Sequence, residues 1–318
     1  MSELKIISLE TVMRKAISWL LKPYIAFGKI TIIEGDPGCG KTMFACYLMA
    51  LLSTGKIYTP DGVQDGLEPI KIVYQNAEDG LADTIVDRLE TAGANMSNIK
   101  VIDETEKLLT MLDVRIEQAI LETGAKLLVL DPFQAYIGEN VDLHRANETR
   151  VVLKQLGAVA ERTDCAIILV RHLAKATGSK ALYKGLGSID IVGAARSVLL
   201  LGSSPNDDSV RGIVQTKNNL AQKGEPMAFR LDENGFEWLG AYDITEDDLS
   251  VGFSSGDKKK QASDLIKKFL NGKDKSVAAN DIISKGIAVG ISKRTMEDAK
   301  RELGIKSVRV GQAWHWKF

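Results

Sequence analysis

The sequence is poor in cysteine, in long apolar runs and in net charge. Its three cysteines cannot build a disulfide framework, and Cys39 lies inside a glycine-rich segment that a bridge would disrupt. No apolar run reaches the ~18 residues that a membrane-spanning helix requires. The N-terminus lacks the charged and apolar pattern of a signal peptide. These absences predict a cytoplasmic protein from a reducing compartment, without a membrane segment.

The small net charge of −1 conceals two regions of opposite sign. Residues 257–318 contain 15 Lys and Arg against 7 Asp and Glu, so this tail carries +8 and the rest of the chain −9. A basic tail on an acidic body indicates that the tail contacts a polyanion. The 318 residues, of which 45% are hydrophobic, are enough for one large domain and a small one.

Residues 30–42 carry the strongest motif. The β-branched run Ile30–Ile33 predicts a buried parallel strand, and G-x-x-x-x-G-K-T follows. The glycines let backbone N–H groups point at phosphate oxygens, Lys41 places a positive charge at the β- and γ-phosphates, and the Thr42 hydroxyl is a Mg²⁺ ligand. An apolar helix from Lys41 directs its positive dipole end at the same phosphates. This segment predicts an NTPase that uses ATP and Mg²⁺, bound by Gly35, Asp36, Pro37, Gly38, Cys39, Gly40, Lys41, Thr42 and Met43.

A carboxylate follows the next predicted strand, residues 70–74. Glu78 falls at the C-terminal end of this strand, where open α/β sheets bind ligands. It is therefore a candidate base for polarising the attacking water. The alternative is an acid at a helix N-terminus, favourable by the dipole alone, and this fits Asp79 at least as well.

The predicted strand 125–131 ends in Asp131, in a chain of alternating strands and helices. This is the second half of a phosphate site, with Asp131 holding Mg²⁺ through water. Pro132 follows, so no glutamate adjoins Asp131 to act as base. That absence favours Glu78 as the catalytic carboxylate.

Three further polar residues are candidates. The strand 166–170 leads into His172, which fits either a γ-phosphate sensor or a packed side chain. Arg196 precedes the strand 197–201 and is either an arginine finger for a neighbouring subunit or part of a strand-end ion pair. The role of Lys217 stays open. The glycine-rich loop 173–188 favours DNA-phosphate contacts, with a solvated loop as the alternative; its lysines are Lys175, Lys180 and Lys184.

The segments flanking this core predict separate regions. Residues 1–28 form an N-terminal arm with an amphipathic helix at 9–21, residues 29–240 an ATPase domain with two antiparallel edge strands, and residues 241–257 a linker. Residues 258–318 read as helix, helix, turn, helix and hairpin, which is a winged helix that binds DNA or protein. We expect Trp314 and Trp316 in the core of the wing. The basic recognition helix offers Lys293, Arg294, Lys300 and Arg301 to DNA.

With these residues, the chain resembles the RecA-like ATPases of the RepA-type hexameric replicative helicases of plasmids, phages and mobile elements. The resemblance covers nearly the whole chain and rests on Gly35–Thr42, Ala77-Glu78-Asp79, Leu130-Asp131-Pro132, Arg171-His172, Gly187-Ser188, Ala195-Arg196-Ser197 and Gly290-Ile291-Ser292. It implies an α/β RecA-like P-loop core and a homo-hexameric ring that moves along single-stranded DNA. It also implies Glu78 as catalytic base, His172 as γ-phosphate sensor and Arg196 as a finger acting across subunits.

Two other functions fit the same residues. One is a recombination or repair ATPase of the RecA/RadA type that does not unwind DNA. The other is an ATP-switched regulator whose winged helix reads a duplex site. Related ring and filament ATPases often end the next strand with Lys-Asn-Arg, but here the residues are Lys217-Asn218-Asn219. The missing arginine shifts the trans-acting role toward Arg196.

Overall fold

The structure is a computed structural model. The chain folds into two compact units. The first contains residues 1–35, 41–199 and 215–225, and the second contains residues 36–40, 200–214 and 226–318. The residues that the structure describes are 6–138, 146–173, 188–250, 255–270, 276–288, 291, 293–311 and 313–317.

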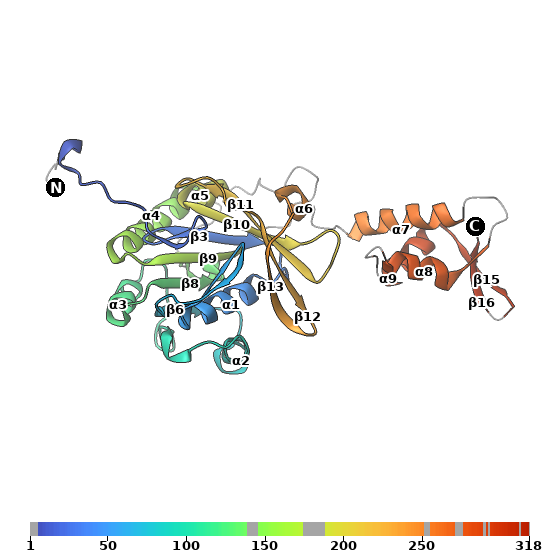
Figure 1. The fold of residues 1–318 in the computed structure, drawn as a ribbon, viewed down its shortest axis with the longest axis horizontal. Coiled ribbons are helices and arrows are strands. Elements are labelled where there is room, and N and C mark those ends of the chain that lie inside the picture. The colour runs from blue at the N-terminus through green and yellow to red at the C-terminus, as the bar shows by residue number, and fades with distance from the viewer. Residues whose placement is uncertain are drawn as a thin grey trace. The chain divides into compact units, whose positions relative to one another are not determined.

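Parallel strands form the centre of the first unit (Figure 1). In spatial order they are β3 (Ile30–Gly35), β9 (Ala166–His172), β8 (Leu127–Asp131), β6 (Ile72–Asn76) and β7 (Ile99–Lys100). Every pairing among them is parallel. Most residues of the central strands are buried on both faces, which explains their continuous apolar runs. The predicted α/β class with a mostly parallel sheet is confirmed.

Helices cover both faces of these strands (Figure 1). One face packs against α3 (Val114–Thr123), α4 (Ala146–Thr163) and α5 (Ser188–Ala194) in a single apolar cluster. Because side chains alternate along a strand, the other residues of the same strands point to the opposite face. That face carries α1 (Lys41–Ser53) and α2 (Val86–Thr91), the latter preceded by a π-helical turn, Leu81–Ile85.

The helix predicted over residues 9–21 is wrong. A 3₁₀ turn (Leu9–Thr11) is followed by extended chain and then by a hairpin of β1 (Trp19–Leu21) and β2 (Ile25–Ala26). Leu9 and Met13 are 87% and 92% exposed, so the amphipathic face finds no apolar surface to cover. An isolated helix of this length is marginal without such packing.

One predicted strand shifts because its partner sets its limits. The strand expected at 70–74 lies at Ile72–Asn76, where it pairs with β8 up to Asp131. Its other neighbour, β7, has only the two residues Ile99–Lys100. A further small hairpin joins β4 (Ile57–Thr59) and β5 (Gly62–Gln64). Among the described residues, no helix is both long and apolar enough to span a membrane.

Antiparallel strands make the other edge of the sheet, as predicted. They are β11 (Val210–Asn218), β12 (Met227–Asp232) and β13 (Gly235–Ala241), following β10 (Ser197–Ser203). The nine-stranded order is β13-β12-β11-β10-β3-β9-β8-β6-β7. Within the segment expected to be a linker, α6 (Glu246–Ser250) buries Leu249 over Gly202 and Gly212, where an added Cβ would lie 3.1 and 3.0 Å from Leu249.

The C-terminal residues of the second unit have a core of their own. They form α7 (Ser255–Phe269), β14 (Val277–Ala278), α8 (Ala279–Ala288), α9 (Lys293–Glu302), β15 (Lys306–Val310) and β16 (Ala313–Lys317). The sheet order is β14-β16-β15, and Ile266, Ile282, Met296 and Trp316 are buried together. The expectation for the wing core is correct for Trp316, 3% exposed, and wrong for Trp314, 59% exposed.

Candidate phosphate site

A tight turn, Asp36–Gly40, joins β3 to α1. The Cys39 N–H donates to the Asp36 carbonyl at 3.3 Å, and Gly38 and Gly40 have φ of +78° and +88°. L-residues with a side chain rarely adopt such angles. A Cβ on Gly40 would also lie 3.4 Å from the Phe229 ring. Both positions therefore favour glycine, and loops of this kind hold phosphate with their backbone amides.

Lys41, Thr42 and Asp131 lie together at the carboxyl edge of the parallel strands. Lys41 is buried and its Nζ donates to the Gly35 carbonyl at 3.0 Å. Asp131, 1% exposed, accepts a hydrogen bond from the Thr42 side chain. Burial raises the pKa of Asp131 to about 6, and the Thr42 hydrogen bond opposes this shift.

The Asp131 carboxylate fits a bound cation. Its Oδ2 is buried and has no hydrogen-bond partner among the described residues. A buried carboxylate oxygen without a partner is costly unless a cation compensates it. Thr42 and Asp131 supply the oxygen ligands that Mg²⁺ prefers beside phosphates.

Glu78 and His172 meet at this edge from two different strands. His172 Nε2 lies 3.3 Å from the Glu78 carboxylate, and its Nδ1 is buried without a hydrogen-bond partner among the described residues. Asn76 orders the Glu78 segment because its Oδ1 accepts the Glu78 and Asp79 N–H groups at 3.0 and 2.7 Å. Both Glu78 and His172 affect the charge state of Asp131, which places all three in one electrostatic environment.

The alternative carboxylate, Asp79, is already paired. Its Oδ2 contacts Arg88 Nη1 at 2.6 Å, which is the structural ion pair that the position of Arg88 on a helix permits. Glu78 is half exposed, with 51% of its side chain accessible. Of these two neighbouring acids, Glu78 is thus the one held next to His172.

A buried ion pair supports the site and was not predicted. Arg171 Nε lies 3.2 Å from Glu34 Oε2, and the two residues are directly opposite in the β3–β9 register. Burial lowers the pKa of Arg171 and the Glu34 charge opposes that change. Each precedes a candidate site residue, Gly35 or His172, so the pair lies one residue before the phosphate loop on β3 and before His172 on β9. The sequence signal was a charged residue at the end of each apolar run.

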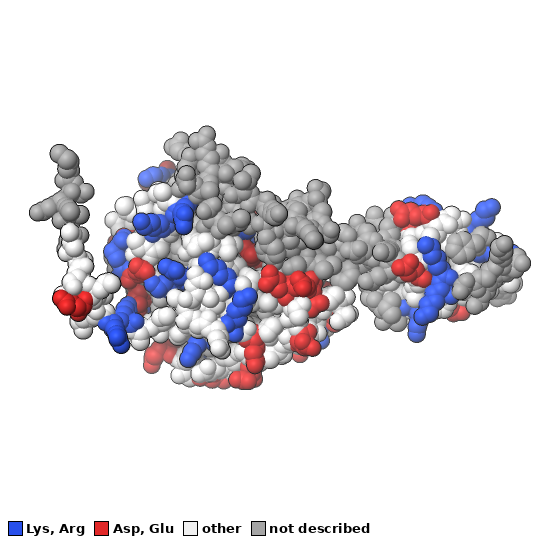
Figure 2. Space-filling view, turned by 90° about the horizontal axis from the view of Figure 1, so that it is seen from above, with Lys and Arg blue, Asp and Glu red and all other residues white. Residues whose placement is uncertain are grey.

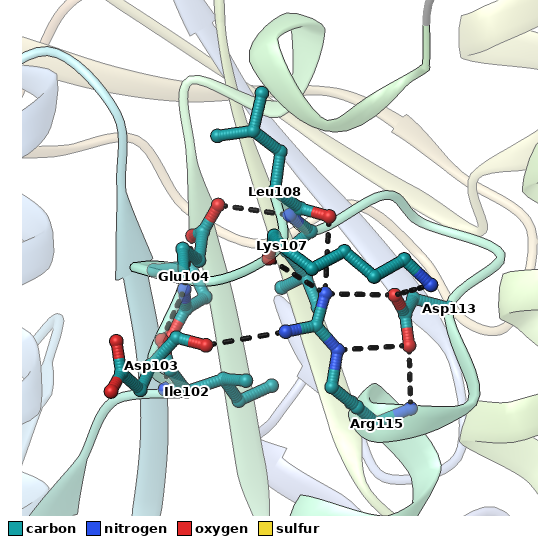
Figure 3. A network of polar contacts seen from close by, with 9 residues as sticks. Ile102, Asp103, Glu104, Lys107, Leu108, Asp113 and Arg115 are labelled. Carbon is teal, nitrogen blue, oxygen red and sulfur yellow. Dashed lines mark hydrogen bonds and ion pairs between the residues drawn. The ribbon is translucent and has the colours of Figure 1, made fainter.

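A second polar network orders the loop between β7 and α3 (Figure 3). Arg115 donates to the carbonyls of Asp103, Lys107 and Leu108 at 3.0–3.2 Å. It also contacts Asp113, and this hydrogen-bonded ion pair holds the pKa of the Asp113 carboxyl far below its usual range. Arg115 thereby holds the start of this loop, at Asp103, close to its end at Asp113.

Glu104 connects this loop to β6. Its Oε1 accepts from Gln75 Nε2 at 2.6 Å and its Oε2 accepts from the Leu109 N–H at 3.0 Å. Gln75 Oε1 accepts the Ile102 N–H at 2.6 Å. Because Gln75 immediately precedes Asn76, the network fixes the strand end from which Glu78 projects. Sequence reasoning missed these positioning residues, since only the fold brings them together.

Arg196 and Lys217 lie at the opposite, amino edge of the sheet. The Arg196 N–H donates to the Ile30 carbonyl at 3.0 Å, at the start of β3. β3 has six residues, so this edge is about 16–20 Å from its own phosphate loop. Arg196 is exposed, and the described part of the chain holds no hydrogen-bond or ion-pair partner for its side chain.

Lys217 has a structural position. Its Nζ donates to the carbonyls of Val192, Gly193 and Ala195 at 2.6, 3.3 and 2.8 Å. These carbonyls end α5, so the lysine caps that helix. Of the two cations left open by the sequence, Lys217 is hydrogen-bonded within its own chain, whereas Arg196 has no hydrogen-bond or ion-pair partner among the described residues.

The predicted DNA-contacting lysines fall in two places. Lys175, Lys180 and Lys184 lie outside the described residues, as does the Arg294 side chain. On α9, Lys293 and Arg301 are exposed. Lys300 instead contacts Ser307 Oγ at 2.6 Å, and its Nζ lies 5.5 Å from the centroid of the Trp316 ring.

The fold and this site define an α/β P-loop ATPase core of the RecA-like kind. Residues 4–178, more than half of the 318, match the AAA domain family AAA_25, and the chain belongs to that family. A curated relative, the DNA repair protein RadA of Halalkalibacterium halodurans, is 23% identical over 70% of the chain and 43% of its own length. The chain thus spans less than half of that relative.

Solved structures with similar folds include a KaiC-like protein from Pyrococcus horikoshii OT3, 17% identical over 71% of this chain and 98% of its own, with a TM-score of 0.48. The RadB recombinase is 19% identical over 68% of this chain and 92% of its own, with a TM-score of 0.44.

Proposed function

We propose that this protein is an ATP-driven helicase or translocase of the RepA type that acts on single-stranded DNA. One observation carries the proposal: Glu78 and His172, predicted independently as base and sensor, lie 3.3 Å apart beside Asp131 and Thr42. This grouping matches what phosphoryl transfer to water requires, namely a base, a phosphate contact and a cation site on one edge.

In the proposed reaction, Glu78 accepts a proton from the water whose oxygen attacks the γ-phosphorus. The bond from that phosphorus to the β–γ bridging oxygen breaks, and ADP and phosphate leave. Lys41 and the amides of the Asp36–Gly40 turn stabilise the negative charge on the phosphates. Thr42 and Asp131 would hold Mg²⁺, which neutralises phosphate charge when it is bound.

His172 couples the phosphate to the following segment. Its imidazole contacts the Glu78 carboxylate. We infer that a γ-phosphate competes for this imidazole and leaves Glu78 available to the water. Because the loop 173–188 continues directly from His172, the same movement transmits phosphate loss to Lys175, Lys180 and Lys184, which would contact DNA phosphates.

The site is completed by a second copy of the chain. Arg196 lies at the far edge from its own phosphate loop, so it reaches a γ-phosphate only in a neighbouring subunit. A ring of such contacts, a homo-hexamer in our proposal, places one ATP between each pair of subunits. The hydrogen bonds of Lys217 to carbonyls at the end of α5 favour Arg196 over Lys217 for this role.

The domain limits in this proposal are those of the sequence analysis: arm 1–28, ATPase 29–240, linker 241–257 and winged helix 258–318. The three helices and the β15–β16 hairpin of the C-terminal region support a winged helix. On its recognition helix Lys293 and Arg301 are exposed, and Arg301 also forms an ion pair with Asp298 at 3.3 Å.

A second candidate function is a recombination or repair ATPase. The similarity to a protein called DNA repair protein RadA favours it at least as much as the helicase. Strand separation and strand exchange assays with ATP distinguish these two. An ATP-switched regulator would instead prefer one duplex sequence over any single strand.

The decisive test is steady-state ATP hydrolysis without DNA, with single-stranded DNA and with duplex DNA, alongside the light-scattering mass with and without nucleotide. Strong stimulation by single strands and a ring-sized mass are expected. A monomer whose slow turnover ignores single strands would contradict the motor and favour the regulator.

A further inference from the structure

The geometry points to a nucleobase-stacking platform at the tip of the β15–β16 hairpin, formed by Trp314 with Arg309 beside it. Its ligand is an unpaired base of a single strand or of a duplex end. The inference rests on the proposed DNA-binding function, and it assigns a site to the C-terminal region that is separate from the phosphate site.

Register puts Trp314 and Arg309 side by side. Arg309 pairs with Trp314 and Ser307 with Trp316, so these four residues share one face of the hairpin. Val308 and Val310 belong to the other face. The tip is set by Gly311, whose φ is +61°.

The inner and outer parts of this face differ in what covers them. Near the domain core, Lys300 of α9 contacts Ser307 and lies over the Trp316 ring, and Trp316 is 3% exposed. Two residues closer to the tip, Trp314 is 59% exposed. The same strand therefore presents one tryptophan as core and the next as an accessible aromatic surface.

An accessible indole on a paired hairpin is suited to stacking. Five consecutive register pairs, from Lys306–Lys317 to Val310–Ala313, hold the strand in place. Ligand binding therefore costs little additional backbone entropy. Every base has a π-face, and stacking on aromatic side chains contributes to single-strand binding without sequence preference.

The charge around the platform selects a polyanion. Arg309, Lys306 and Arg301 are exposed on or beside the hairpin, and a strip of Lys and Arg side chains crosses the face of this region shown in Figure 2. Residues 257–318 carry 15 basic against 7 acidic residues. Phosphate contacts next to an aromatic platform are the combination that single-strand binding surfaces use.

Stacking and charge are separated by measuring binding of the full chain, without ATP, to labelled oligothymidylate and to an abasic oligomer of equal length. Trp314→Ala should weaken thymidylate binding by roughly tenfold and leave abasic binding unchanged. Its log–log salt slope should stay at the wild-type value. Arg309→Ala should weaken both oligomers and reduce that slope by about 1.

Two variants control for folding. Trp314→Phe keeps an aromatic ring and should retain most of the thymidylate affinity. Val310→Ala removes an exposed apolar side chain, 49% accessible, from the other face of the same tip and should change neither affinity. Far-ultraviolet circular dichroism and the urea unfolding midpoint should be unchanged in all of these variants.

Several outcomes would overturn the platform. Wild-type thymidylate affinity in Trp314→Ala would do so, as would an equal loss on the abasic oligomer, and these leave the proposed motor intact. A wild-type chain that binds neither oligomer would reject both the platform and the proposed function. Loss of capture of a protein partner, with DNA affinity unchanged, would assign Trp314 to a protein contact instead.

Discussion

The carboxyl and amino edges of the parallel strands use charge in opposite ways. At the carboxyl edge Asp131, Lys41 and the Glu34–Arg171 pair are buried, and one Asp131 oxygen has no hydrogen-bond partner in the part of the chain that the structure describes. At the amino edge the charges are largely exposed and paired, as in Lys29–Glu161 at 2.5 Å and Lys15–Asp164 at 3.1 Å.

This contrast separates function from stability. Exposed ion pairs contribute about 0–1 kcal/mol each, so the amino edge needs no ligand to account for its charges. A buried carboxylate oxygen that accepts no hydrogen bond destabilises the folded chain unless a bound cation compensates its charge. Arg196 is the exception on the amino edge, because it is exposed beside Glu161 and Lys217 yet has no partner among the described residues.

The largest effect is expected from this exception. Arg196→Ala should lower ATP hydrolysis by about 10³–10⁵-fold, because a finger stabilises the charge of the transition state. Nucleotide affinity of the isolated chain should stay near wild type. Mixing Arg196→Ala with Lys41→Ala should restore part of the hydrolysis, since each subunit supplies what the other lacks. No recovery in the mixture would place Arg196 outside the site.

Glu78→Gln tests the carboxyl edge. Turnover should fall by about 10²–10⁴-fold, the range for a general base, while ATP still binds because the amide keeps the size of the side chain. Turnover is measured by phosphate release and binding by equilibrium titration. Asp79→Asn is the matched control: it weakens the Arg88 ion pair and should affect stability more than turnover. Hydrolysis at the wild-type rate by Glu78→Gln would contradict the assignment of Glu78 as the catalytic base.

The Asp131 carboxyl makes stability depend on pH. Its pKa of about 6 in the folded chain exceeds the ordinary value of 3.8, so the folded state binds more protons between these values. The free energy of unfolding therefore decreases as pH rises through this window, by about 3 kcal/mol for this group.

Asp131→Asn should remove that contribution and stabilise the nucleotide-free chain at pH 7.5. Urea unfolding at pH 7.5 and pH 5, compared with wild type, measures the difference. Asp164→Asn, an exposed acid at the amino edge, should keep the wild-type pH dependence. A pH dependence unchanged by Asp131→Asn would show that its carboxylate is not destabilised by burial.

The smallest effect is expected for Lys217→Ala. It removes the contacts to the Val192, Gly193 and Ala195 carbonyls and should cost about 1–2 kcal/mol of unfolding free energy. Hydrolysis per folded molecule should change little. Lys29→Ala, which removes an exposed pair, should cost less. A large loss of hydrolysis with intact stability would reassign Lys217 to the subunit contact.

The sequence by itself determined the parallel α/β core and the phosphate loop. The short continuous apolar runs at 30–33 and 127–130, and the glycines at 38 and 40, are local signals whose meaning does not depend on distant residues. The sequence also predicted that Glu78, Asp131 and His172 lie at the carboxyl edge of the sheet, because parallel strands place their carboxyl ends together.

Only the tertiary structure decided which side chains have a hydrogen-bond or ion-pair partner and which are exposed. Three examples are the Asp79–Arg88 ion pair, the capping of α5 by Lys217 and the exposure of Trp314. Each depends on contacts that the folded chain makes or leaves open. The failed helix at 9–21 has the same origin. Its pattern was amphipathic, but a helix needs an apolar surface to pack on, and only the folded chain shows that this surface is missing.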